Sequence, residues 1–134
     1  MKMKSVLNHL VSKEIKIEFT YEVLTDNQIF THGFNLFNSN DVHIISSHDV
    51  DSKTLLAPVS KGVYKASIII PRNFLVEGGY KCSFAIMKYN PFTVEFHEME
   101  TVGFSVIDEL DDTEARGSYN GKLPGLVRLK LNWE

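Results

Sequence analysis

Apolar and polar residues alternate along most of the chain with the two-residue period of β-strands. In the clearest stretch, every second position from Ile15 to Val23 is aliphatic or aromatic, and the positions between them are Lys, Glu or Thr. Successive side chains of a strand point to opposite faces of its sheet. This stretch therefore predicts a strand with one buried face and one solvated face.

The same pattern predicts further strands, separated by turn residues. Asp26–Asn27, the run from Asn38 to Asp41, and Gly78–Gly79 are typical turn sequences. No segment carries a convincing helical period. The predicted strands cover residues 15–23, 28–37, 42–47, 62–70, 80–86, 99–107 and 127–133. Short strands at this spacing favour an all-β fold, a two-sheet antiparallel sandwich.

A chain of 134 residues is expected to form one domain, 1–134, with residues 1–11 as a loosely ordered leader. Trp133 closes the last predicted strand. Val127, Leu129, Leu131 and Trp133 occupy every second position and so have the same phase, on one face of this strand. This phase predicts that Trp133 is buried, that truncation at Lys122 unfolds the protein, and that any homodimer is organised around this strand.

The composition excludes several classes of protein. The formal net charge is −3 at pH 7, whereas nucleic-acid-binding domains usually carry a basic patch, so no nucleic-acid partner is expected. Apolar runs such as Ile68 to Ile70 are far shorter than the roughly 20 residues of a membrane span, and no signal peptide is expected. Cys82 is the single cysteine, so no internal disulfide forms, and its phase indicates a packed thiol.

Motifs that would indicate catalysis are absent from the sequence. It has no Gly-x-x-x-x-Gly-Lys-Ser/Thr phosphate loop and no Gly-x-Ser-x-Gly nucleophile elbow. We therefore expect no enzyme activity, no cofactor and no metal. The loop residues His43, His48, Asp49 and Asp51 leave a metal-binding loop open as an alternative.

Small residues occupy positions opposite the predicted core faces, where a solvated sheet usually carries longer polar side chains. They are Ser67, Ser83, Ala85, Thr101, Gly103 and Ser105. A face with small side chains lets a ligand or another layer of structure approach its backbone. We expect either a shallow trough for an extended polar ligand or a second packed layer.

The order of several short motifs resembles a known family. The motifs are the alternating strand from Ile15 to Tyr21, His32–Phe37, Gly62–Tyr64, Ile70–Pro71, Leu75 with Gly78–Tyr80, Val102–Val106, and Gly125–Leu129 with Trp133. In this order, from about Ser12 to Glu134, the chain resembles the C-terminal domain of the Wzt-type ATP-binding subunits of bacterial polysaccharide ABC exporters. The resemblance implies an immunoglobulin-like or jelly-roll sandwich.

The resemblance also implies a function. In that family the domain is cytoplasmic and recognises the finished O-antigen glycan, so that export is coupled to completion of the chain. The implied partners are a polysaccharide ligand and, as parts of one exporter, a nucleotide-binding domain and a transmembrane subunit. The implied location is the inner face of the cytoplasmic membrane.

The candidate glycan-binding residues lie off the predicted core faces. Phe37 and Tyr89 are candidates for stacking on a sugar ring. The polar candidates that would fix its orientation are Asn35, Ser83, Thr101 and Ser105.

Other functions remain open at this point. The chain could be a structural or protein-interaction sandwich that dimerises through a strand edge, or the glycan-binding module of a polysaccharide-modifying transferase. A calcium-dependent, C2-like membrane binder would use the loop carboxylates Asp26, Asp41, Asp49 and Asp51.

Overall fold

The computed structural model describes residues 2–4, 8–50, 57–89, 92–108 and 115–134, with the backbone alone for 2–4, 8 and 96–102. The strands are β1 (Lys2–Lys4), β2 (Asn8–Leu10), β3 (Ile15–Val23), β4 (Thr31–Asn38), β5 (His43–His48), β6 (Gly62–Ile70), β7 (Gly78–Lys88) and β8 (Thr93–Ile107). No helix long and apolar enough to cross a membrane occurs among these residues.

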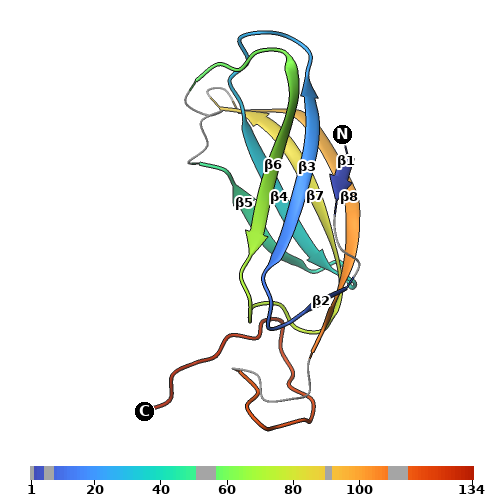
Figure 1. Ribbon diagram of the computed structural model, residues 1–134, viewed down its shortest axis with the longest axis vertical. Coiled ribbons are helices and arrows are strands. Elements are labelled where there is room, and N and C mark those ends of the chain that lie inside the picture. The colour runs from blue at the N-terminus through green and yellow to red at the C-terminus, as the bar shows by residue number, and fades with distance from the viewer. Residues whose placement is uncertain (1, 5–7, 51–56, 90–91, 109–114) are drawn as a thin grey trace.

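The strands form two sheets that face each other (Figure 1). One sheet has three strands in the order β1-β3-β6, and the other has five in the order β2-β8-β7-β4-β5. All neighbours pair antiparallel except β2 and β8, which are parallel. The predicted all-β sandwich is confirmed.

Aromatic rings join the two sheets at the centre of the core. The ring of Phe19 on β3 stacks on that of Phe84 on β7, with centroids 4.1 Å apart and planes 18° apart. Both side chains are almost fully buried, as is Cys82, the packed thiol that the sequence predicts. The buried positions of β3 alternate as expected, because every second side chain points toward the facing sheet.

Residues 2–4 and 8–10, within the leader that the sequence predicts to be loosely ordered, form two short strands. Lys2–Lys4 pairs with residues 18–20 of β3, and Asn8–Leu10 pairs with residues 105–107 of β8. Backbone pairing with two existing sheet edges holds these two strands, although neither has a long apolar pattern of its own. Strand β8 also begins at Thr93 rather than at residue 99, because its first half pairs with β7 as far as Lys88.

The predicted final strand at 127–133 does not form, and Trp133 is 92% exposed rather than buried. Pairing stops at a single bridge between Leu75 and Val127. Arg128 points inward instead, with only 5% of its side chain exposed, and its N–H donates to the Phe74 carbonyl oxygen at 2.7 Å. In an extended chain this turns the odd-numbered apolar side chains outward. The C-terminal end leaves the sandwich in Figure 1.

An ion-pair cluster centred on the buried Asp108 carboxylate holds the start of this C-terminal segment. Arg116 Nη2 lies 2.6 Å from Asp108 Oδ2, Arg128 Nη1 also contacts that oxygen, and Arg128 Nη2 lies 2.6 Å from Glu77 Oε2. Burial alone would raise the pKa of the Asp108 carboxyl, but hydrogen bonds from the two arginines outweigh it and lower that pKa. The cluster ties residues 116–128 to the end of the sandwich.

We predict that the two parts of the C-terminal segment contribute differently to stability. At protein concentrations where the chain is monomeric, deletion of residues 129–134 should leave the unfolding free energy within about 0.5 kcal/mol, because Leu129, Leu131 and Trp133 are largely exposed. Arg128→Ala should lower the unfolding free energy by roughly 1.5–3 kcal/mol, because it removes a charged hydrogen bond to the buried Asp108 carboxylate and another to Glu77. Urea denaturation followed by circular dichroism measures both. An equal loss in the two variants would contradict this division.

Candidate functional site

The candidate site is the outer face of the five-stranded sheet, the side of β5-β4-β7-β8 that points away from the core. Strand register brings the side chains of this outer face together. Asn35 is paired with Ser83 and Ser46, Phe37 with Lys81 and His43, Lys81 with Gly103, and Gly79 with Ser105. Four of the predicted site residues, Asn35, Phe37, Ser83 and Ser105, therefore share one face.

A hollow of about 480 Å³ lies at the β7–β8 end of the outer face. Its lining comprises Ser39, Gly79, Tyr80, Lys81, Gly103, Phe104 and Ser105. A Cβ added at Gly103 would lie 3.7 Å from the Tyr80 carbonyl oxygen, so the lack of a side chain exposes backbone there. The predicted trough of small residues exists at this end, with Gly103 and Ser105 exposed.

Beside the hollow, polar side chains are joined in a chain of hydrogen bonds. His43 Nε2 lies 3.0 Å from Asn35 Oδ1, and Asn35 Nδ2 donates to Ser83 Oγ at 3.4 Å. The ring of Phe37 stacks on that of His43, with centroids 4.6 Å apart and planes 26° apart. A register shift between Leu36 and Phe37 brings His43 opposite Phe37.

Ser83 differs from the expectation of an open trough, since only 1% of it is exposed. Ala85 is also buried, and the Met87 side chain covers Gly33, where an added Cβ would lie 2.8 Å from Met87 Cε. The middle of the outer face is therefore filled rather than lowered. Ser83 therefore acts on this face through Asn35, its hydrogen-bond partner.

A second aromatic group lies at the other end of the outer face. Tyr89, 37% exposed, shares a hydrogen bond of 2.6 Å between its hydroxyl and His48 Nδ1, and its ring lies 6.1 Å from that of Phe92. Thr101, the sixth predicted site residue, has a side chain outside the described part of the chain. From the sequence, His43 and His48 were candidates only for a metal-binding loop. In the structure each contacts one of the two aromatic candidates for sugar binding, His43 with Phe37 and His48 with Tyr89.

The chemistry of the outer face suits a neutral, polyhydroxylated ligand. Among its described side chains, the polar groups of Asn35, Ser105 and His43 are an amide, a hydroxyl and an imidazole, and Lys81 is paired with Asp41. Aromatic rings offer flat apolar surfaces beside these hydrogen-bonding groups, a combination that orients ligands with both apolar and polar faces.

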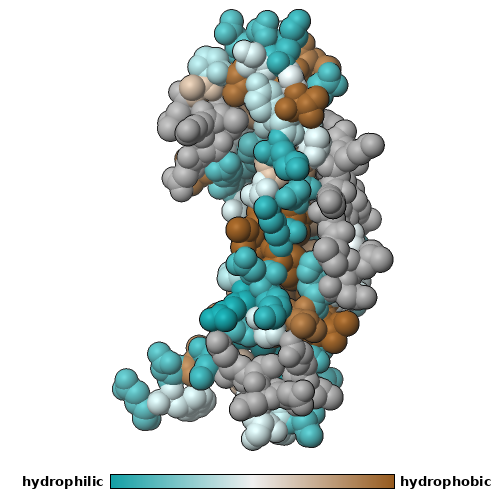
Figure 2. All heavy atoms as spheres, viewed as in Figure 1, coloured by the Kyte–Doolittle hydropathy of each residue, from teal (hydrophilic) through white to brown (hydrophobic). Residues whose placement is uncertain are grey.

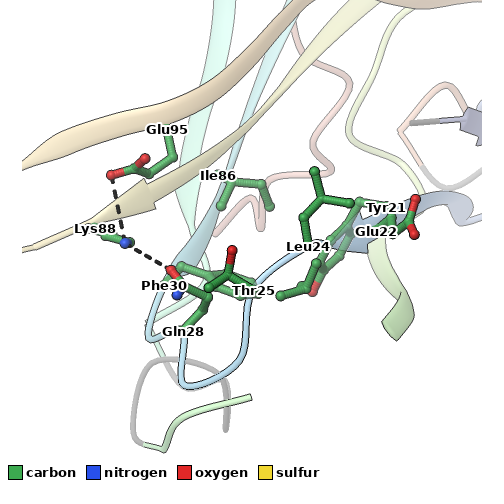
Figure 3. A pocket seen from close by; sticks show the side chains of 10 residues that line it. Tyr21, Glu22, Leu24, Thr25, Gln28, Phe30, Ile86, Lys88 and Glu95 are labelled. Carbon is green, nitrogen blue, oxygen red and sulfur yellow. Dashed lines mark hydrogen bonds and ion pairs between the residues drawn. The ribbon is translucent and has the colours of Figure 1, made fainter. Parts of the chain in front are cut away.

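A separate pocket of about 440 Å³ lies at one end of the sandwich (Figure 3). Tyr21, Val23 and Phe30 form a largely buried apolar wall. On its rim, Lys88 Nζ donates to Gln28 Oε1 at 3.0 Å and lies 3.9 Å from Glu95 Oε1. These rim groups are already paired with one another, and none of the predicted site residues lies here.

Two of the carboxylates proposed for calcium, Asp26 and Asp41, lie at opposite ends of a strand. Asp26 lies in the connection between β3 and β4, and Asp41 lies in the turn between β4 and β5, at the opposite end of β4 (Figure 1). Asp51 lies outside the described residues. Within the described part of the chain, no group of three His, Cys, Asp or Glu side chains is arranged to hold a metal ion.

Two facing sheets with this strand order place the protein among the β-sandwiches of the immunoglobulin-like and jelly-roll type. Among solved structures, the chain is similar to the crystal structure of the C-terminal domain of Wzt, with a TM-score of 0.71 and 16% sequence identity. The match covers 98% of this chain and 78% of that one. No family model and no curated protein matches. The chain therefore has the fold of the Wzt C-terminal domain, as the sequence motifs predict.

We predict opposite outcomes for two arginine substitutions on the outer face. Ser105→Arg should change the unfolding free energy by no more than about 0.5 kcal/mol, because Ser105 is exposed. Ser83→Arg should lower it by about 3 kcal/mol or more, because the site is buried and would receive both excess volume and an unpaired charge. Urea denaturation of both variants checks this, and a stable Ser83→Arg would show that the middle of the face is open.

Proposed function

We propose that this protein is a non-catalytic domain that binds a bacterial cell-surface polysaccharide of the O-antigen kind. The observation that carries the proposal is the outer face, where a hollow lined by small residues adjoins the stacked rings of Phe37 and His43. The fold shared with the Wzt C-terminal domain supports it.

In the proposed mechanism, a glycan chain lies along β7. Phe37 and Tyr89 offer their rings to the C–H faces of sugars, while Asn35, Thr101 and Ser105 bond the hydroxyl groups and Ser83 fixes the amide of Asn35. The strand rises about 3.4 Å per residue, so Lys81 and Tyr89 lie roughly 27 Å apart along it. A site of this length suits several consecutive sugars.

The proposal extends to export. By resemblance to the Wzt-type subunits, binding here would report that the polysaccharide is complete and couple that signal to an ABC transporter. The proposed partners are the nucleotide-binding domain and the transmembrane subunit of the exporter, at the inner face of the cytoplasmic membrane. No cofactor takes part in this proposal.

A glycan array of bacterial polysaccharides, followed by calorimetry on the best ligand, tests the proposal. We expect Ser105→Arg and Phe37→Ala each to weaken binding at least tenfold, about 1.4 kcal/mol, because one blocks the hollow and the other removes a ring. The matched control is Val63→Arg, at a 70% exposed strand position of the other sheet, and it should bind within twofold of the natural protein.

Binding should also survive a metal chelator. Equal loss in Val63→Arg, or no polysaccharide bound by the natural protein on a broad array, would contradict the proposal.

A second function, protein interaction through the C-terminal segment, is favoured by one observation. Leu129, Leu131 and Trp133 are 56%, 67% and 92% exposed and alternate with polar residues. An extended apolar edge of this kind pairs readily with another chain. We predict a homodimer through this segment, and that deletion of residues 129–134 yields a folded monomer by light scattering. A natural protein that stays monomeric at high concentration would contradict it.

A further inference from the structure

A third concavity lies between the free edges of the two sheets. Strands β5 and β6 are edge strands of different sheets, and a pocket of about 270 Å³ opens between them. Its lining includes His32, Ser47, Asp49, Ala66, Ile68 and Phe84. In Figure 2 the outline is hollowed on the left, the side on which Figure 1 draws β5 and β6.

Asp49 is fixed at three points beside this pocket. Its backbone N–H donates to the His32 carbonyl oxygen at 2.9 Å, and its own carbonyl oxygen accepts a hydrogen bond from Thr31 Oγ1. Its Oδ2 atom lies 3.3 Å from His32 Nδ1. A side chain held in this way loses little conformational freedom when a ligand binds, so less of the binding energy is spent on ordering it.

The hydrogen-bonded chain behind Asp49 has a defined direction. A carboxylate only accepts hydrogen bonds, so Nδ1–H of His32 donates to Asp49, and Nε2 accepts from the Tyr21 hydroxyl at 2.8 Å. Burial lowers the pKa of His32 and raises the pKa of Tyr21 to about 12. Both groups therefore stay neutral at neutral pH, and Asp49 carries the charge of this chain.

One oxygen of the carboxylate has no partner among the residues that the structure describes. His32 contacts Oδ2, no described residue donates to Oδ1, and the Asp49 side chain is 42% exposed at the pocket. Because Oδ1 accepts no hydrogen bond within the described part of the chain, a bound molecule with hydroxyl groups could donate one to it. An anion would be repelled by the same charge.

We propose that this pocket binds a single neutral sugar ring, with Asp49 accepting hydrogen bonds from its hydroxyl groups. The volume is below the ~300–1,000 Å³ typical of sites for larger ligands, which favours one ring over an oligosaccharide. Ala66 and Ile68, both partly exposed, supply an apolar wall for the C–H face, and Ser47 supplies a hydroxyl.

The pocket is distinct from the outer face, although both include residues of β5. Side chains alternate along a strand, and the register pairs Ser46 with Asn35 on the outer face and Ser47 with Phe34 on the core side. Adjacent residues therefore belong to different sites, and the sugar pocket does not depend on polysaccharide binding by the outer face.

This alternation provides a matched pair of variants. The probes are the methyl glycosides of glucose, galactose and mannose, with glucuronic acid as an anionic comparison, titrated into ¹⁵N-labelled protein and followed by NMR. We expect at least one methyl glycoside to shift the amide signals around Ser47 and Asp49, and glucuronic acid to bind at least tenfold more weakly. Ser47→Leu and Asp49→Asn should each weaken binding at least tenfold, whereas Ser46→Leu should stay within twofold.

Ser47→Leu keeps the proposal testable if Asp49→Asn fails to fold, because it fills the pocket without touching the Asp49–His32 contact. Loss of binding in Ser46→Leu but not in Ser47→Leu would assign the sugar to the outer face and overturn the proposal, as would no shift with any methyl glycoside. Ser105→Arg separates the two sites further. This variant should retain methyl glycoside binding whether or not the outer face of the natural protein binds polysaccharide.

Discussion

The contact between Phe19 and Phe84 determines how the two sheets lie against each other. The rings stack 4.1 Å apart and come from β3 and β7, which lie inside their sheets rather than at the edges. Because β7 pairs with β4 on one side and β8 on the other, fixing Phe84 in the core sends the alternate residues of all three strands outward. The outer face and the pocket beside His32 both depend on this register.

The sequence was sufficient to predict most of the sandwich because burial on one face leaves a two-residue period. The prediction for β3 was correct to the residue, since Ile15–Val23 is buried on one side only. The same period at the C-terminus was misleading. Leu129, Leu131 and Trp133 alternate just as clearly, but no neighbouring strand in the described chain covers them. Alternation indicates a strand-forming segment, whereas burial also requires a partner.

The candidate site was predicted in part for a similar reason. Strand phase was enough to place Asn35 and Phe37 on the outer face, but residue size did not reveal that Ser83 is covered. Side-chain contacts between distant positions left no signal in the sequence. His32 and Asp49 are 17 residues apart, and their contact depends on how the chain continues past the end of β5 along β4.

The exposure of Trp133 has a practical consequence. It is the single tryptophan of the chain, and it stands 92% exposed at the end of a segment that contributes little to the core. Indole emission of this protein therefore comes from the tail alone, free of background from the sandwich. The emission wavelength and anisotropy of this indole change when another surface covers the tail. Assembly of the natural protein can therefore be followed without an added label.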